Sequence, residues 1–152
     1  MPSKPVGLKK STPYYELLMS NAFKIYPEKA VLLAALTAAT VEQESTWVNN
    51  LVSRSGCKGL GQLCDQGVMK KYNVTDPMNV KQNLWGSMNY IADNLRQWGD
   101  RRLLYVASSY HAGGGAASRA FHRGVLPDTS DGLIKTSSYS VQVLSKMKNY
   151  LE

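Results

Sequence analysis

Two glutamates stand two residues apart in the segment VEQESTWVNN, residues 41–50, directly after a long apolar stretch. A carboxyl group that faces a pocket can serve as a general acid or base. On a helix, Glu42 and Glu44 would point about 200° apart, so only one of them can face a given cleft. Glu44 would share a side with Thr37 and Thr40, at or near the helix end, and is the candidate acid. Glu42 is expected to be a solvated surface charge.

Polar and aromatic residues suited to a sugar-binding cleft follow Glu44 in three blocks. The first block, ESTWVNNLVSRSGCKGLGQL, holds a serine nine residues after the acid and a glutamine eighteen residues after it. The second block is YHAGGG and the third is KTSSY. Hydroxyl, amide and imidazole groups can all hydrogen-bond to a polar ligand. The candidate substrate-binding residues are Ser53, Gln62, Tyr110, His111 and Tyr139.

The order and spacing of these blocks resemble the lytic transglycosylase family of lysozyme-like enzymes. Its pattern is E-S-x-[FW], a serine, G-L-M-Q, then Y-N-A-G-x-G, and last E-T-x-x-Y. The resemblance runs from about residue 30 to the end of the chain. It implies a mostly α, lysozyme-like single domain of the goose-type or lytic transglycosylase kind, with little or no β structure. It also implies that Glu44 is catalytic and that the five residues above contact the sugar.

The chain departs from the family pattern at four positions. His111 stands where the family has Asn, and because imidazole can donate or accept, its sugar contact would depend on pH. Gly61 replaces the Met of G-L-M-Q, Gly114 replaces a frequent Pro, and Lys135 replaces the Glu before Thr. None of these changes touches Glu44, so they bear on substrate detail more than on the reaction class.

The resemblance implies cleavage of the β-1,4 bond between N-acetylmuramic acid and N-acetylglucosamine without water. Glu44 would first donate a proton to the glycosidic oxygen and then take one from the C6 hydroxyl, which closes a 1,6-anhydro ring. The muramic N-acetyl oxygen would replace the second carboxylate that most glycosidases need. Donation near neutral pH requires a raised pKa, which a largely apolar cleft would supply for Glu44.

Two other functions are compatible with the same residues. A hydrolytic muramidase on this fold would need a water-activating carboxylate opposite Glu44, and Asp65 and Asp76 are the candidates. A non-catalytic cell-wall-binding module is favoured by the two substitutions His111 and Lys135. Peptidoglycan glycan strands are the expected partner in each case.

Composition sets the remaining limits. The 152 residues suit one domain, and 18 basic against 11 acidic residues give a net charge of +7. The basic residues are scattered, which suits a polyanionic surface such as a cell wall and predicts no specific binding of nucleic acid. No cofactor is expected, and the chain is expected to be a monomer.

Location can be addressed only as an expectation. Residues 1–20 lack the apolar core of a secretory signal, and VLLAALTAA, residues 31–39, is far shorter than the ~20 residues that span a bilayer. The chain is therefore expected to be trimmed, or to reach the bacterial cell wall or periplasm by another route. Release as a phage endolysin, or delivery with a virion, is the favoured route.

The two cysteines, Cys57 and Cys64, leave two interpretations open. A turn in the intervening Gly-rich stretch could bring them within disulfide range, or both could remain reduced thiols packed as small apolar groups. Together with His111 and His122 they do not match zinc-finger spacing, so no metal is expected.

Helices must carry these residues, because no strand of ordinary length is evident. Residues 1–12 are expected to form a flexible N-terminal arm, and residues 13–152 a single catalytic domain. A largely buried helix is predicted over 28–46, rich in Ala and Leu. A second is predicted from Pro77 to Trp98, capped by Asp76 or Thr75. The remaining expected elements are helices near 14–26, 101–111, 116–123 and 139–151, turns or short strands with one brief helix over 48–75, and a loop over 124–137.

Overall fold

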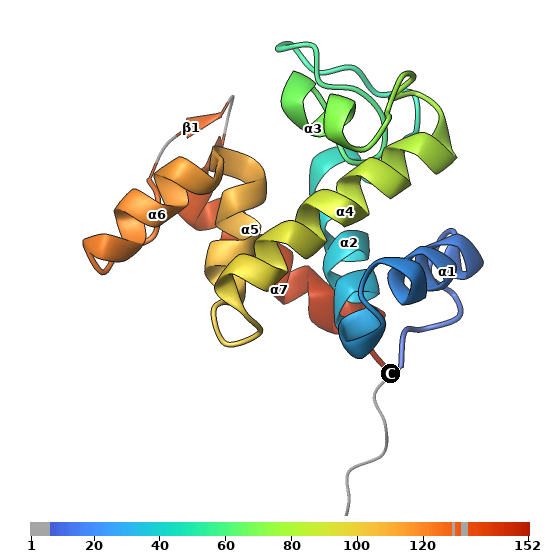
Figure 1. The fold of residues 1–152 in the computed structure, drawn as a ribbon, viewed down its shortest axis with the longest axis horizontal. Coiled ribbons are helices and arrows are strands. Elements are labelled where there is room, and N and C mark those ends of the chain that lie inside the picture. Colours follow the sequence, from blue (N-terminus) through green and yellow to red (C-terminus); the bar gives the residue numbers. More distant parts are fainter. Residues whose placement is uncertain (1–6, 129, 132–133) are drawn as a thin grey trace, which may run out of the picture.

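The computed structural model describes residues 7–128, 130–131 and 134–152, and within them the chain is mostly helical (Figure 1). The only two strands there are two residues long and pair antiparallel, with Ser130 opposite Lys135. The prediction of a mostly α chain is confirmed. In chain order the elements are α1 (Tyr15–Ile25), η1 (Pro27–Lys29), α2 (Ala30–Ser45), α3 (Gln66–Lys71), α4 (Val80–Trp98), α5 (Leu103–Ala112), α6 (Gly114–His122), β1 (Ser130–Asp131), β2 (Ile134–Lys135), α7 (Thr136–Met147) and η2 (Lys148–Tyr150).

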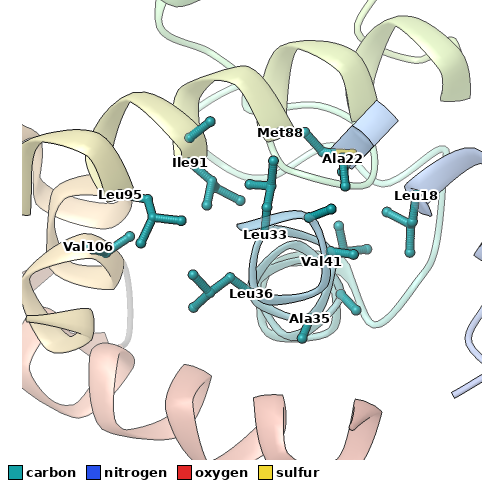
Figure 2. Close-up of a cluster of buried hydrophobic side chains, with 14 of the residues drawn as sticks. Leu18, Ala22, Leu33, Ala35, Leu36, Val41, Met88, Ile91, Leu95 and Val106 are labelled. Atoms are coloured by element: carbon teal, nitrogen blue, oxygen red, sulfur yellow. The ribbon is translucent and has the colours of Figure 1, made fainter. Parts of the chain in front are cut away.

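Helix α2 is the centre of the fold and packs against α1, α4 and α7. Its sequence is almost entirely Ala, Leu, Val and Thr up to Val41, which favours a helix buried on all sides. Figure 2 looks along α2 and shows Leu33 and Leu36 reaching outward among side chains of α1, α4 and α5. The predicted central helix is confirmed, with Pro27 opening a short 3-10 turn ahead of it.

Helix α4 ends as predicted but begins later. Gly99 follows Trp98 and ends the helix, since its φ of 79° is open to glycine at little cost. The predicted start at Pro77 is wrong, because Asn79 is the N-cap and its side-chain oxygen accepts from the Gln82 amide at 3.0 Å. Asp76 instead accepts from the Met78 amide, so the residues before Asn79 form a separate turn.

The N-terminal segment differs from the expected flexible arm. Residues 1–6 lie outside the described part of the chain, but residues 7–12 are held against the C-terminus. Leu8 is buried and pairs with Leu151, while the Lys9 amide donates to the Tyr150 carbonyl at 2.8 Å. Backbone pairing and burial of one leucine therefore fix this segment.

The C-terminal third carries a short hairpin where a loop was expected over 124–137. Strands β1 and β2 lead directly into α7, which begins at Thr136 and so starts earlier than predicted. Helix α7 then packs along both α2 and α5 (Figure 1). This packing brings the third sequence block, which ends on Tyr139, beside the end of α2.

Candidate active site

Glu44 lies in the last turn of α2, where the helix emerges from the core. The helix ends because Thr46 adopts the left-handed conformation and its amide donates to the Glu42 carbonyl at 3.0 Å. Residues 33–41 are buried, whereas Glu44 is half-buried. Its carboxyl group is thus carried by a rigid element and placed at the edge of the core.

Tyr139 binds the carboxyl group of Glu44 directly. Its hydroxyl donates to Glu44 Oε2 at 2.8 Å from the first half of α7, and its side chain is buried. The His111 ring stacks on the Tyr139 ring, with centroids 4.2 Å apart and planes at 19°. The structure therefore brings together three of the predicted site residues, from three different helices.

Tyr110 joins this group from α5. Its hydroxyl donates to the Gly61 carbonyl at 2.6 Å, and its ring lies 5.3 Å from that of Tyr90. Burial raises the pKa of Tyr110 and of Tyr139 above the ordinary value, and the negative charge of Glu44 raises both further. Both hydroxyls thus stay protonated and act as hydrogen-bond donors.

Tyr90 is a residue that sequence reasoning missed. It lies on α4 and donates its hydroxyl to the Ser109 carbonyl at 3.1 Å, next to Tyr110 in the chain. Burial is the main cause that raises the pKa of Tyr90, and the negative charge of Asp65 is the second. Only the helical spacing of α4 could have indicated it, and that spacing cannot tell a site-lining tyrosine from a core one.

Gln62 and Ser53 lie in the loop between α2 and α3, where both make bonds within the loop. The Gln62 side-chain amide donates to the Leu51 and Gly59 carbonyls, at 3.0 and 2.9 Å. The Ser53 hydroxyl accepts from the Cys57 amide at 3.1 Å. In this structure their side chains shape the loop, and a role in binding sugar stays a prediction.

A disulfide joins Cys57 and Cys64 across this loop, with their Cα atoms 4.4 Å apart. Of the two interpretations that the sequence left open, the structure has the bonded form. Lys58, between the two cysteines, pairs with Val52 on one side and Leu63 on the other. The disulfide and these backbone pairs therefore fix the same short segment, which runs from Cys57 to Leu63.

Glu42 is not the solvated charge that the sequence suggested. Its Oε1 accepts from the Tyr150 hydroxyl at 2.6 Å, and that hydroxyl accepts from Trp47 Nε1 at 3.0 Å. The side chain is half-buried, and it ties the C-terminal turn to α2. The prediction failed because Tyr150 is 108 residues away in the chain, which local pattern does not reveal. Glu42 and Glu44 thus bind different partners, as their opposite directions on the helix require.

Asp65 and Asp76, the carboxylates considered as partners of Glu44, each accept a hydrogen bond from a nearby backbone amide. Asp65 caps α3 by accepting from the Val68 amide at 3.0 Å, and Asp76 accepts from the Met78 amide at 3.0 Å. Both residues are exposed. Each carboxylate therefore has a structural role in its own turn.

Comparison with known proteins decides the family. The family model described as "Transglycosylase SLT domain" matches residues 21–125, which is more than half of the chain. The chain belongs to the transglycosylase SLT domain family. The matched residues of this SLT domain include Glu44, Gln62 and Tyr110, whereas Tyr139 lies beyond them and is tied to the site by its bond to Glu44.

Curated relatives of this SLT domain are longer proteins. It is 30% identical over 131 residues to a membrane-bound lytic murein transglycosylase F of Pseudomonas fluorescens, covering 80% of this chain and 26% of that protein. It is 32% identical over 114 residues to the protein of that name from Pseudomonas syringae pv. tomato, covering 71% and 22%. The chain thus spans about a quarter of the length of these relatives.

Solved structures share the fold. The SLT domain superposes on an inactive variant of the lytic transglycosylase Slt from Pseudomonas aeruginosa with a TM-score of 0.69, covering 92% of this chain and 24% of that one. For the 70 kDa soluble lytic transglycosylase from Escherichia coli the TM-score is 0.71, with coverage of 90% and 24%. Identity is 18% in both cases, which supports the fold. The predicted lysozyme-like fold is confirmed.

The buried tyrosines of the SLT domain make its stability sensitive to alkaline pH. The pKa of Tyr150 is raised from 10.0 to about 12, mainly by burial and next by the hydrogen bond to Glu42. The pKa values of Tyr110 and Tyr139 are also raised. Below pH 10 the folded and unfolded chains both hold these protons. Above it the unfolded chain releases protons that the folded chain keeps, so stability falls between pH 10 and pH 12, by about 1.4 kcal/mol per pH unit for each such group.

Urea unfolding at several pH values in that window tests this expectation. Tyr150→Phe removes one titrating group. The unfolding free energy of this variant is therefore expected to fall less steeply with pH, by the contribution of one group. An unchanged slope in Tyr150→Phe would contradict the assignment.

Proposed function

We propose that this SLT domain is a peptidoglycan lytic transglycosylase that cleaves the β-1,4 bond between N-acetylmuramic acid and N-acetylglucosamine without water. The observation that carries the proposal is the half-buried Glu44 carboxyl group, bound by Tyr139 in a chain of this family. The murein transglycosylase names of the two relatives support the same reaction class. Because the chain spans a quarter of those proteins, the activity is proposed for this domain by itself.

The reaction uses one acid twice. Protonated Glu44 donates to the glycosidic oxygen as the bond to the muramic anomeric carbon breaks, and the N-acetyl oxygen of that sugar stabilises the positive charge. Ionised Glu44 then takes the proton of the C6 hydroxyl, whose oxygen bonds to the anomeric carbon. Glu44 ends protonated, as it began, and the product is a 1,6-anhydro sugar.

Tyr139 keeps the carboxyl group of Glu44 oriented through both steps. Its hydroxyl donates to Oε2 and holds the carboxyl group in place while protons pass to and from the sugar. Because burial and the charge of Glu44 raise the pKa of Tyr139, it remains a donor when Glu44 is ionised. Tyr139 thus keeps its proton throughout, whereas Glu44 gives up a proton and later regains one.

The remaining site residues are proposed to hold the glycan strand. The Gln62 amide nitrogen is used within the loop, so its carbonyl oxygen is the atom proposed to accept from a sugar hydroxyl. Tyr110 and His111 are proposed to contribute ring surface and, for His111, a pH-dependent hydrogen bond. Ser53 is proposed to line the same cleft from the loop.

Removing the Tyr139 hydroxyl is expected to slow cleavage and leave the fold intact. Hydrogen bonds to charged groups are worth about 1.5–3 kcal/mol, so Tyr139→Phe should lower the rate roughly ten- to a hundredfold. The phenylalanine ring still stacks on His111, and Tm should change little.

Loss of turbidity of purified peptidoglycan measures the rate. Tyr105→Phe is the matched control, since it also loses one hydroxyl bond, to the Val125 carbonyl, but has no contact with Glu44. Equal rates for both variants would contradict the role of Tyr139.

Delivery to the wall is a separate part of the proposal. None of the helices within the described residues combines the length and apolarity needed to cross a bilayer. The relatives named above are membrane-bound proteins of bacteria. The net charge of +7 suits binding to an anionic wall by any route. We propose phage-borne delivery for this chain, as an endolysin or with the virion. Lysis or virion genes beside its own gene are the expected observation, and a bacterial wall-maintenance neighbourhood would contradict it.

The catalytic proposal is tested by digesting purified peptidoglycan and assaying the soluble fragments for reducing ends. A lytic transglycosylase releases fragments without creating reducing muramic ends, because the anhydro ring blocks them. Release together with a matching rise in reducing ends would indicate the hydrolytic muramidase. Absence of any release would indicate a wall-binding module.

A further inference from the structure

Gly61, the residue before Gln62, is held through both of its backbone polar groups. Its amide donates to Asn83 Oδ1 at 2.8 Å, and its carbonyl accepts from the Tyr110 hydroxyl at 2.6 Å. Ser87 links these two partners, because its hydroxyl donates to Asn83 Oδ1 at 3.2 Å and lies 3.3 Å from the Tyr110 hydroxyl. Two residues of α4 and one of α5 thus meet at a single residue of the loop.

The loop is wrapped around the Asn83 side chain. Asn83 is 1% exposed and Ser87 is fully buried. The Asn83 amide nitrogen donates to the carbonyls of Lys58 and Pro77, at 3.0 and 2.8 Å. A buried polar network with its groups paired is rigid, and breaking one member leaves the others without partners in a medium of low dielectric constant.

Space, as well as hydrogen bonding, fixes this contact. A methyl group on Gly61 would lie 2.0 Å from Ser87 Oγ and 2.7 Å from the Tyr110 hydroxyl. Glycine is therefore required here by the close approach of α4, not by an unusual backbone angle. The resembled family pattern has Met before Gln, whereas in this chain Ser87 and Tyr110 occupy the space that a side chain of residue 61 would need.

We infer that Asn83 and Ser87 are positioning residues for the sugar-binding loop. Acting through Gly61, they set the place of Gln62 on the loop and of the Tyr110 side chain beside Glu44. The inference rests on the proposed function, because it concerns how the same site is held ready for the glycan. It assigns a role to two buried residues of α4 that the catalytic steps do not use.

Two variants test the inference on soluble peptidoglycan fragments, with kcat/KM and Tm both measured. Ser87→Ala loses two long neutral hydrogen bonds, one to Asn83 Oδ1 and one from the Tyr110 hydroxyl, and should lower kcat/KM about fivefold. Gly61→Ala forces the loop away from α4, and a displacement of about 1 Å at a site can cost about a hundredfold. The control is Gly67→Ala, since Gly67 is exposed and an added methyl there meets only the Asp65 side chain, at 3.1 Å. Its rate should match the wild type.

Rescue distinguishes positioning from general destabilisation. Ser87→Gly removes Ser87 Oγ, the nearest atom that the new methyl would strike, and leaves the Tyr110 hydroxyl, at 2.7 Å. Gly61→Ala combined with Ser87→Gly should therefore recover at least tenfold over Gly61→Ala alone. Because Ser87→Gly adds a glycine inside α4 and lowers stability, mere destabilisation predicts that the double variant is worse. That outcome, or rate losses no larger than the lost folded fraction, would overturn the inference. A wild type that does not cleave would instead overturn the proposed function.

Discussion

Glu44→Gln is expected to abolish cleavage of peptidoglycan while leaving the fold unchanged. Positioned acid–base catalysis contributes about 10²–10⁴-fold, and glutamine can neither donate a proton to the glycosidic oxygen nor take one from the C6 hydroxyl. Its amide oxygen can still accept from Tyr139, so the contact between α2 and α7 remains. Turbidity loss of purified wall and a thermal unfolding curve measure the two expectations.

The matched control is Glu42→Gln, on the same helix and equally half-buried. Its carboxylate binds Tyr150, in the network that ties the C-terminal turn to α2. Glu42→Gln is expected to keep a rate within a few-fold of wild type, with the larger effect on Tm. Wild-type rates for Glu44→Gln, or equal losses for the two variants, would remove Glu44 from the mechanism.

Leu36→Ala is expected to have the largest effect on stability. Leu36 is 1% exposed and belongs to the buried cluster that α2 forms with α4 and α5 (Figure 2). Truncating a buried leucine removes transfer free energy and leaves a cavity, which together cost about 2–5 kcal/mol. That is a large share of the roughly 5–15 kcal/mol that stabilises a domain.

Urea unfolding measures the loss, with Phe23→Ala as the control. Phe23 is 58% exposed on α1, so its truncation should change the unfolding free energy far less. A loss below about 1 kcal/mol in Leu36→Ala, or a larger loss in Phe23→Ala, would contradict the central place given to α2.

The sequence predicts the parts of this protein that depend on local pattern. The density of Ala and Leu before Glu44 predicts α2, and the glycine after Trp98 predicts the end of α4, because both signals act within a few residues. Glu44 was predicted as the acid from its place at the end of that helix and, through the family resemblance, from its offsets to Ser53 and Gln62. The family match covers most of these residues.

Two of the errors share a physical cause, which is contact between distant segments. Glu42 was taken as solvated because its partner Tyr150 comes 108 residues later. The segment at residues 7–12 was taken as flexible because its pairing with Leu151 joins segments from opposite ends of the sequence. Local competition explains the late start of α4, since Asn79 caps that helix in place of Asp76. The contacts of Asn83 and Ser87 with Gly61 could not be predicted either, because they join residues that are distant in the sequence.

The most direct test of the single-acid mechanism is to digest peptidoglycan in water enriched in the heavy oxygen isotope and weigh the fragments by mass spectrometry. If Glu44 returns its proton through ring closure, the fragments will carry anhydromuramic ends, will be lighter by one water than hydrolysis products, and will contain no heavy oxygen. Heavy oxygen on a reducing muramic end would show that water attacks the anomeric carbon, and the mechanism proposed for Glu44 would be wrong.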